Sequence, residues 1–321
     1  MNASPETSAP KASGHRGAGA DALLRRLEWS VIRRLDGLLQ GDYRTLMRGS
    51  GVDLADLREY QPHDDVRHID WNVTARSQVP HVRVFTEDRE MAAWFLLDLS
   101  PSMDFGSGEQ AKRAVSTQFV AVLARLLTRH GNRVGAMVYD GQGDAGGHGV
   151  NALVPARNGR AHVLHLLHTV LRRPVASGAT ATDLRHLLAA AAGNIRRRST
   201  VFVVSDFISA PGWDIPLGQL ARRHDVVAVR LIDPLELDLP DLGLVTLRDA
   251  ETGAHLLVDT HDKGFRHRFA RIAAQREAEL RAGFASAGVD TLELSTADDL
   301  LDAMRRFMDM RRRRVRAPQA A

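Results

Sequence analysis

Residues 91–104 read Met-Ala-Ala-Trp-Phe-Leu-Leu-Asp-Leu-Ser-Pro-Ser-Met-Asp, and this stretch decides the expected fold class. Its first seven residues form an apolar run without polar alternation, which is typical of a central parallel strand covered on both faces. Asp98 ends the run and is therefore expected at the carboxyl edge of the sheet, where open α/β folds bind ligands. The stretch predicts a parallel α/β sheet with a polar loop at its edge.

The loop after this strand offers oxygen ligands for a metal ion. Asp98, Ser100 and Ser102 supply one carboxylate and two hydroxyls, and such hard donors suit Mg²⁺ or Mn²⁺. The alternative is an ordinary strand-to-helix turn in which Ser100 or Ser102 caps the next helix. The spacing of these three residues does not decide between the two interpretations.

Strands alternate with helices from residue 91 onward. The expected strands are 91–97, 133–139, 151–155, 201–204, 225–232 and 289–294, with an antiparallel pair near 243–248 and 254–258. The expected helices are 109–130, 159–172, 182–197, 214–223, 263–285 and 298–314. Such alternation implies right-handed crossovers, and so a doubly wound, mainly parallel sheet of Rossmann type.

The sequence pattern divides the whole chain into four expected regions. Residues 1–20 are rich in Ser, Ala, Gly and Pro and are expected to be disordered. Residues 21–90 form a helical and irregular N-terminal extension, with an amphipathic helix over 21–40 and a strand at 82–85. The α/β domain is expected over 91–310. Residues 311–321 form an expected basic tail, and deleting it should change the melting temperature of the protein little.

Composition narrows the class of protein. The 321 residues are 44% hydrophobic and contain no cysteine, which excludes disulfides and thiolate chemistry. No apolar run reaches the roughly 18 to 20 residues that cross a bilayer, and the polar N-terminus lacks the apolar core of a signal peptide. We therefore expect a cytoplasmic protein without a membrane segment.

Two further loops are expected at the same edge of the sheet. Thr182 opens an expected helix, and Asp206 follows the apolar strand 201–204. Thr180 is a second candidate in the first of these loops, and Thr182 is favoured because Asp183 and Leu184 follow it. Alone, Thr182 could equally cap the helix and Asp206 could begin a turn. Together with Asp98, Ser100 and Ser102, they resemble in order the three loops of a von Willebrand factor A domain with a metal-ion-dependent adhesion site.

The chain also resembles the domain-of-unknown-function-58 family, a bacterial group in which a signature segment precedes a von Willebrand A-like domain. The residues that carry this resemblance are Leu57-Arg58-Glu59-Tyr60, Asp64 through Trp71, Ala75-Arg76, Pro155 through Arg160, and Ser205-Asp206-Phe207. The likeness runs from about residue 41 to 310. It implies a MoxR-type AAA+ ATPase as partner, with the pair acting in assembly or remodelling of other proteins. By itself, the charged segment 57–76 could form a structural network of Arg–carboxylate pairs, or a binding or catalytic face.

Three functions follow from these residues. The first is a non-enzymatic interaction module whose metal ion leaves one position open for a carboxylate of the partner. The second is a Mg²⁺-dependent phosphatase of haloacid dehalogenase type, although Ser100 stands where that chemistry needs a second Asp. The third is nucleic-acid binding through the basic tail. His162, His165 and His168 share one expected helix, but without a His-Glu-x-x-His motif they are expected on a partly exposed face.

Overall fold

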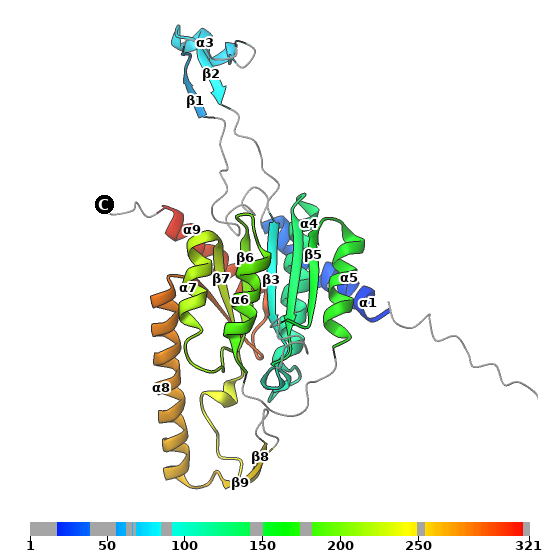
Figure 1. The fold of residues 1–321 in the computed structure, drawn as a ribbon, viewed down its shortest axis with the longest axis vertical. Helices are drawn as coiled ribbons and strands as arrows, with labels where there is room; N and C mark the ends of the chain where they lie inside the picture. Colours follow the sequence, from blue (N-terminus) through cyan, green and yellow to red (C-terminus); the bar gives the residue numbers. More distant parts are fainter. Residues whose placement is uncertain are drawn as a thin grey trace, which may run out of the picture.

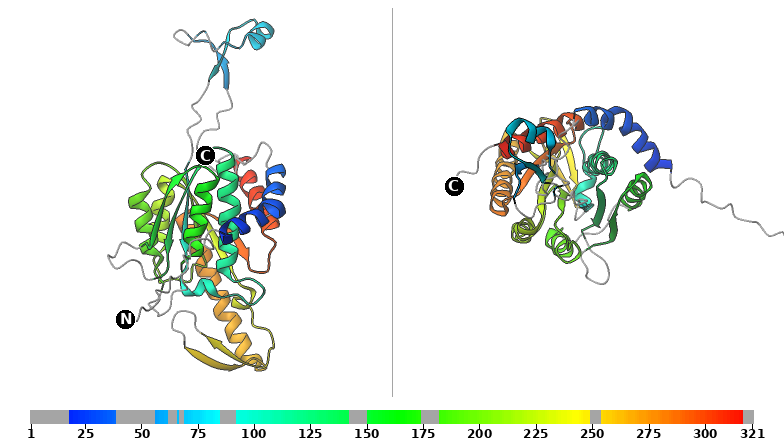
Figure 2. Two further views of the ribbon diagram at one scale, coloured as in Figure 1. Left: turned by 90° about the vertical axis from the view of Figure 1, so that its right-hand side faces the viewer. Right: turned by 90° about the horizontal axis from the view of Figure 1, so that it is seen from above.

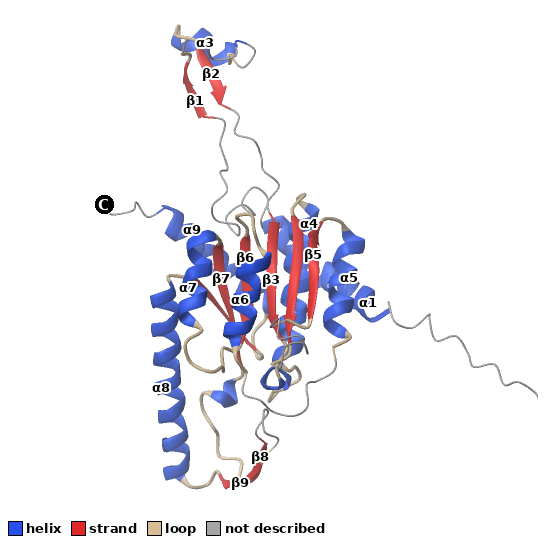
Figure 3. Cartoon of the chain, viewed as in Figure 1, coloured by secondary structure: helices blue, strands red, loops and turns tan. Residues whose placement is uncertain are grey.

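The apolar run before Asp98 forms the central strand of a six-stranded sheet. The computed structural model describes residues 18–38, 56–61, 66, 69–84, 92–141, 150–173, 182–248 and 254–316. The sheet order is β10–β7–β6–β3–β4–β5 (Figures 1 and 3). Its strands are β3 (Ala92–Asp98), β4 (Arg133–Tyr139), β5 (Ala152–Arg157), β6 (Thr200–Ser205), β7 (Asp225–Ile232) and β10 (Asp290–Ser295). Every neighbouring pair is parallel except β4 and β5, which confirms the expected mainly parallel α/β sheet.

Helices cover both faces of the sheet, as Figure 2 shows. One face packs against α4 (Lys112–Arg129), α5 (Arg160–Leu171) and α9 (Leu300–Arg316). The other face packs against α6 (Leu184–Asn194), α7 (Asp214–Arg223) and α8 (Lys263–Ala287). Alternate residues of β3 explain the two layers, because Phe95 and Leu97 enter the first core and Leu96 enters the second.

The N-terminal helix belongs to the first core rather than to a separate unit. It runs as α1 (Ala18–Leu27), a π-helical turn (Glu28–Ile32) and α2 (Arg33–Leu38). Leu24, Ile32 and Leu35 are fully buried in the same cluster as the residues of α4. The helix of the expected N-terminal extension thus packs on the sheet domain, which covers its apolar stripe.

Two smaller sheets stand apart from the main one. The first pairs β1 (Asp56–Glu59) with β2 (His81–Val84) and includes the short helix α3 (Trp71–Ser77), which the sequence did not predict. The second pairs β8 (Leu244–Arg248) with β9 (His255–Asp259) as the expected antiparallel pair. It is inserted between β7 and α8 and lies beyond the carboxyl end of the main sheet (Figure 1).

Helices extend past the expected region boundaries at both ends of the described chain. Residues 18–20, assigned to a disordered segment, are helical, and Ala20 is buried against the core. Residues 1–17 lie outside the described part of the chain. At the other end, α9 continues to Arg316, and Arg311 is 1% exposed. Its guanidinium lies 2.8 Å from Asp225 and 3.8 Å from Asp290. Arg311 is therefore stabilised by buried ion pairs rather than by contact with solvent. None of the described helices is long and apolar enough to span a membrane.

Candidate metal centre at the sheet edge

The candidate site lies where the order of the strands reverses direction. The chain leaves β3 for β4 on one side, whereas β6 pairs with β3 on the other, with Leu97 opposite Val204. Asp98 ends β3 and Asp206 directly follows β6. Such a switch point at the carboxyl edge is where doubly wound sheets bind ligands.

Asp98 is fully buried and held by two hydrogen bonds. Its Oδ1 accepts the backbone N–H of Ser100 at 2.9 Å, and its Oδ2 accepts the hydroxyl of Ser205 at 2.6 Å. Ser205 Oγ also accepts the backbone N–H of Phe207 at 2.9 Å. One hydroxyl therefore links the first loop to the third. The sequence pattern around Asp206 does not predict this role of Ser205.

Ser100 and Ser102 point their hydroxyls at each other rather than capping a helix. Their Oγ atoms lie 3.2 Å apart, and both side chains are buried. Ser100 precedes the 3₁₀ turn Pro101–Asp104, yet its side chain makes no capping hydrogen bond to that turn. The capping alternative is therefore wrong for Ser100.

Thr182 joins the same cluster from the second loop. It is 1% exposed, and its carbonyl accepts the backbone N–H of Ala210 and the hydroxyl of Ser209. The cap of α6 is Asp183, whose side chain accepts the backbone N–H of Arg185, so Thr182 is not the N-cap. Thr180 lies outside the described residues.

Gly141 marks the place where the first and second loops meet. A Cβ atom at this position would lie 3.4 Å from Thr182 Oγ1 and 3.5 Å from the Cβ of Ser100. The residue has a φ of +93°, which L side chains rarely adopt, so both space and backbone favour glycine here. The hydroxyl of Tyr139 donates to the carbonyl of Gly141 and accepts the backbone N–H of Asp183, which ties the two loops together.

Asp206 sits on a strained turn that buried aromatic rings hold in place. The next residue, Phe207, has a φ of +59° although it is not glycine. Its ring packs 5.2 Å from the ring of Trp213 and 4.8 Å from that of Phe284, measured between centroids. Asp206 Oδ1 accepts the backbone N–H of Ile208 at 3.0 Å. The backbone N–H of Ile208 and the packed ring of Phe207 therefore fix the position of the Asp206 carboxylate.

Lys112 is a buried cation that binds Asp206 of this cluster, and no sequence motif predicted it. Its side chain is fully buried at the start of α4, with Nζ 2.6 Å from Asp206 Oδ2 and 2.6 Å from Glu236 Oε1. Glu236 Oε2 in turn accepts the backbone N–H of Asp233 in a capping box. Lys112 thus connects Asp206 to the short 3₁₀ helix Pro234–Glu236 that follows β7.

The electrostatics of the site favour an added positive charge near Asp98. Burial, together with the negative charge of Asp206, raises the pKa of Asp98 to about 6, against the opposing hydrogen bonds from Ser205 and Ser100. Burial alone would lower the pKa of Lys112, but the charges of Asp206 and Glu236 outweigh it and the pKa is raised. Lys112 therefore stays protonated and compensates Asp206, whereas Asp98 has no cation of its own among these contacts.

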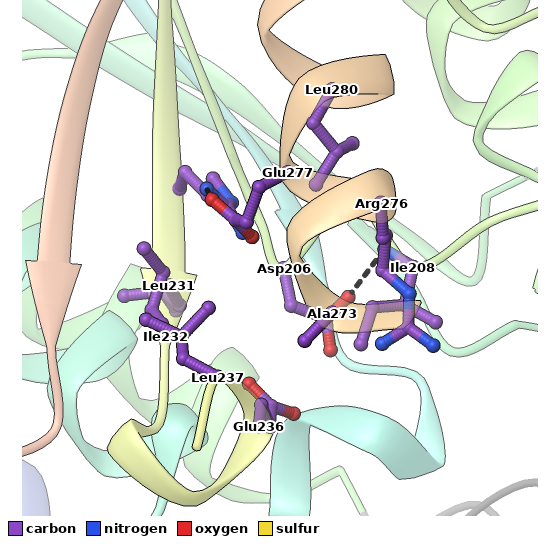
Figure 4. A pocket seen from close by; sticks show the side chains of 11 residues that line it. Asp206, Ile208, Leu231, Ile232, Glu236, Leu237, Ala273, Arg276, Glu277 and Leu280 are labelled. Carbon is purple, nitrogen blue, oxygen red and sulfur yellow. Dashed lines mark hydrogen bonds and ion pairs between the residues drawn. The ribbon is translucent and has the colours of Figure 1, made fainter. Parts of the chain in front are cut away.

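A small pocket lies behind Asp206, between β7 and α8. Figure 4 shows Asp206 beside Ala273, with Leu237 and Glu236 at the lower left and Arg276 of α8 at the right. The enclosed space is about 10 Å³, roughly the room of one water molecule. This space is too small for an organic ligand.

The donor set fits a small divalent cation. Asp98 and Asp206 supply carboxylates and Ser100, Ser102 and Thr182 supply hydroxyls, all hard oxygens on three converging loops. The described residues contain no group of three or more Asp, Glu, His or Cys side chains placed around one point. A metal here would therefore depend on hydroxyls and water for most of its coordination, as Mg²⁺ commonly does.

Other candidate residues fall outside this cluster. Asp70 is buried and accepts the backbone N–H of Val73 at the start of α3, whereas Trp71 is 70% exposed. Much of the expected charge network in 57–76 involves residues outside the described part of the chain. His165 is exposed, as expected, and His162 hydrogen-bonds the backbone carbonyl of Val134.

Comparison with known sequences identifies the family. Residues 56–279 match the family described as "Protein of unknown function DUF58". The chain belongs to the DUF58 family. The match includes the β1–α3–β2 unit and all three loops of the candidate site, and it is narrower than the expected likeness over 41–310.

Mycobacterial relatives of this DUF58 protein are uncharacterized. The proteins Rv1480 of Mycobacterium tuberculosis and Mb1516 of Mycobacterium bovis are each 38% identical over 292 residues, covering 91% of this chain and 90% of each relative. Among solved structures, BatB from Bacteroides thetaiotaomicron has a TM-score of 0.43 and 12% identity, covering 70% of this chain and 99% of that one. An aerotolerance-related membrane protein from Bacteroides fragilis has a TM-score of 0.42 and 10% identity, covering 68% and 99%.

Proposed function

We propose that this DUF58 protein is a non-enzymatic interaction module, built on a von Willebrand A-like domain with a metal-ion-dependent adhesion site. The observation that carries the proposal is the convergence of three loops at one switch point of the sheet. There, Asp98, Ser100, Ser102, Thr182 and Asp206 present only hard oxygens around a buried carboxylate of raised pKa. Mg²⁺, or Mn²⁺ in its place, is the cation that such a set favours.

Each side chain has a distinct task in this proposal. Asp98 supplies the buried negative charge, while Ser205 and the backbone of Ser100 keep its oxygens in place. Ser100, Ser102 and Thr182 supply neutral donors, so the cation keeps part of its charge for an incoming ligand. Asp206 is shared with Lys112 and would contact the cation directly or through water. The bound cation would supply one open coordination position, which a carboxylate of the partner protein fills.

The partner in this proposal is a MoxR-type AAA+ ATPase, and the pair would assemble or remodel other proteins in the cytoplasm. This part rests on the resemblance of the chain to its family. The absence of cysteine suits a reducing compartment. An ATPase partner also suits a chain whose sequence has no phosphate-binding Gly-x-x-x-x-Gly-Lys loop of its own.

A catalytic role is the less favoured proposal. A haloacid dehalogenase-type phosphatase needs a second Asp two residues after the first as its acid and base, and Ser100 occupies that position. Nucleic-acid binding through the tail is also less favoured, because Arg311 is buried in an ion pair and cannot contribute to a basic surface.

The test measures binding of the purified ATPase from the same genome to the purified full-length protein, with Mg²⁺ and with EDTA. Substituting Ser102, Thr182 or Asp206 with Ala should weaken metal and partner binding together. Loss of one such ligand costs about 1–3 kcal/mol, or about five- to 150-fold in affinity. The matched control is His165→Ala, on an exposed part of α5. Equal partner binding in EDTA and by the Asp206→Ala protein would contradict the proposal.

A further inference from the structure

Strand β10 forms one edge of the main sheet and leaves part of its backbone unpaired. Among the described strands its neighbour is β7, which runs parallel to it. The N–H of Thr296, just after the strand, donates to the carbonyl of Ile232 at 2.9 Å, so this backbone position faces β7. Backbone groups alternate in direction along a strand, and the N–H and C=O groups of Thr291 and Glu293 therefore face away from the sheet. No hydrogen bond from the described residues reaches these outward groups.

The unpaired backbone groups lie in a groove of about 510 Å³ that follows the edge of the sheet. One wall of this edge groove comes from α8, with Phe284 and Ala285, and the other comes from α9, with Phe307 and Met310. Phe284 belongs to the core on one face of the sheet and Phe307 to the core on the other face. The groove therefore surrounds the edge of β10. Such a groove fits an extended chain, whose side chains point alternately toward the two walls.

The opposite edge of the sheet is blocked in a way that β10 is not. Proteins commonly protect exposed strand edges with proline or with charged side chains. The opposite edge strand, β5, contains Pro155, which has no N–H to offer to a further strand. By contrast, β10 contains no proline, and its exposed charge, Glu293, lies 3.3 Å from Arg230 of the neighbouring strand. The β10 edge is therefore open to one more strand.

We propose that the edge groove binds an extended segment of a partner protein, which pairs with β10 as a seventh strand of the sheet. The segment takes the backbone hydrogen bonds that Thr291 and Glu293 offer, and its side chains pack alternately toward Phe284 and Phe307. A second copy of the chain is disfavoured as the occupant, because its own β10 is flanked by α8 and α9, and these helices would meet the walls of the groove first. The inference does not rest on the metal centre, since the groove contains none of its residues.

Arg281 indicates that the segment carries an acidic side chain on the side of α8. The two acidic residues that line the groove already have partners, since Glu293 lies 3.3 Å from Arg230 and Asp298 lies 3.1 Å from Arg306. Arg281 also lines the groove and is exposed, and within the described part of the chain no carboxylate lies at ion-pair distance from it. A glutamate of the bound strand would supply the missing partner.

The test follows the fluorescence anisotropy of a labelled peptide, Ser-Thr-Val-Glu-Val-Thr-Val-Ser, with the full-length protein, and binding should be saturable. Thr291→Pro removes an outward N–H and leaves the ladder to β7 in place, so it should weaken binding about tenfold or more. Its control, Thr291→Ala, keeps the N–H and should bind like wild type. Ala285→Trp fills the groove from α8 and should also weaken binding about tenfold, whereas Ala282→Trp, exposed on the same helix outside the groove, should not.

Two further probes separate strand pairing from unspecific adhesion. A peptide N-methylated at its five central residues should lose binding, because it lacks the backbone donors that pair with β10. Arg281→Glu should weaken binding of the glutamate peptide about tenfold, and replacing that glutamate with lysine should restore it. EDTA and Asp98→Ala should leave peptide affinity unchanged, so failure of the metal centre would not affect this result.

The inference is overturned if wild type does not bind the peptide, or if the N-methylated peptide binds equally well. It is also overturned if Thr291→Pro and Ala285→Trp keep full affinity while melting like wild type. A dimer in light scattering that Thr291→Pro dissociates would assign the edge groove to a second copy of the chain instead of a partner, and would overturn it too.

Discussion

Replacing Lys112 with Met should strongly destabilise the protein in the absence of divalent metal. The substitution keeps much of the side-chain volume but removes a fully buried cation that lies 2.6 Å from both Asp206 and Glu236. Asp206 is 2% exposed and would lose its buried cation. Breaking a buried pair in this way costs about 3–5 kcal/mol. At about 2–4 °C per kcal/mol for a domain of this size, Tm should fall by about 6–20 °C.

The assay is thermal unfolding followed by circular dichroism in EDTA, repeated with a series of MgCl₂ concentrations. Arg185→Met is the matched control, because Arg185 pairs with Asp183 at the same 2.6 Å but its side chain is 53% exposed, so solvent screens the pair. Mg²⁺ should restore part of the stability of Lys112→Met and should bind it more tightly than it binds wild type, because the competing ammonium is gone. The reasoning fails if Lys112→Met loses no more stability than Arg185→Met.

Three further predictions concern pH, the C-terminal helix and catalysis. The folded pKa of Asp98 is about 6, above its ordinary value of 3.8, so stability of the metal-free protein should decline as pH rises between these values, and Mg²⁺ affinity should weaken as pH falls below about 6. Thermal unfolding in EDTA checks the first trend, Mg²⁺ titrations at pH 5, 6 and 7.5 check the second, and a flat affinity would remove Asp98 from the metal site. Arg311→Met should cost about 3–5 kcal/mol in unfolding free energy, because it removes the buried guanidinium beside Asp225 and Asp290, whereas Arg305→Met on the exposed side of α9 should melt like wild type. Purified protein should hydrolyse neither a generic phosphate ester nor ATP, and Mg²⁺-dependent turnover lost in Asp98→Asn would require the enzyme interpretation.

Most of the sheet could be predicted because its strands are buried on both faces. Apolar runs such as 91–97 and 201–204 are shorter than typical helices, and an Asp follows each within two residues, so their length and ends favour strands. The antiparallel direction of β5 and the short helix α3 could not be predicted in this way. Both depend on pairing and packing partners that are distant in the sequence.

The candidate site shows the same division. Asp98 and Asp206 could be predicted at one edge, because each follows a parallel strand and such strands end together. Ser205 and Lys112 could not, because their roles arise from contacts 107 and 94 residues apart in the chain. The burial of Arg311 in the expected basic tail could not be predicted for a related reason, since its partners Asp225 and Asp290 are distant acidic residues rather than part of an apolar stripe.

The central claim is that the sheet edge holds a divalent cation through Asp98, and calorimetric titration with Mg²⁺ and with Mn²⁺ tests it most directly. Wild type and the exposed-surface control His165→Ala should bind one ion per chain, weakly and alike. Asp98→Ala should show no binding while its circular dichroism matches that of wild type. Unchanged metal affinity in Asp98→Ala, or no binding by wild type, would contradict the account.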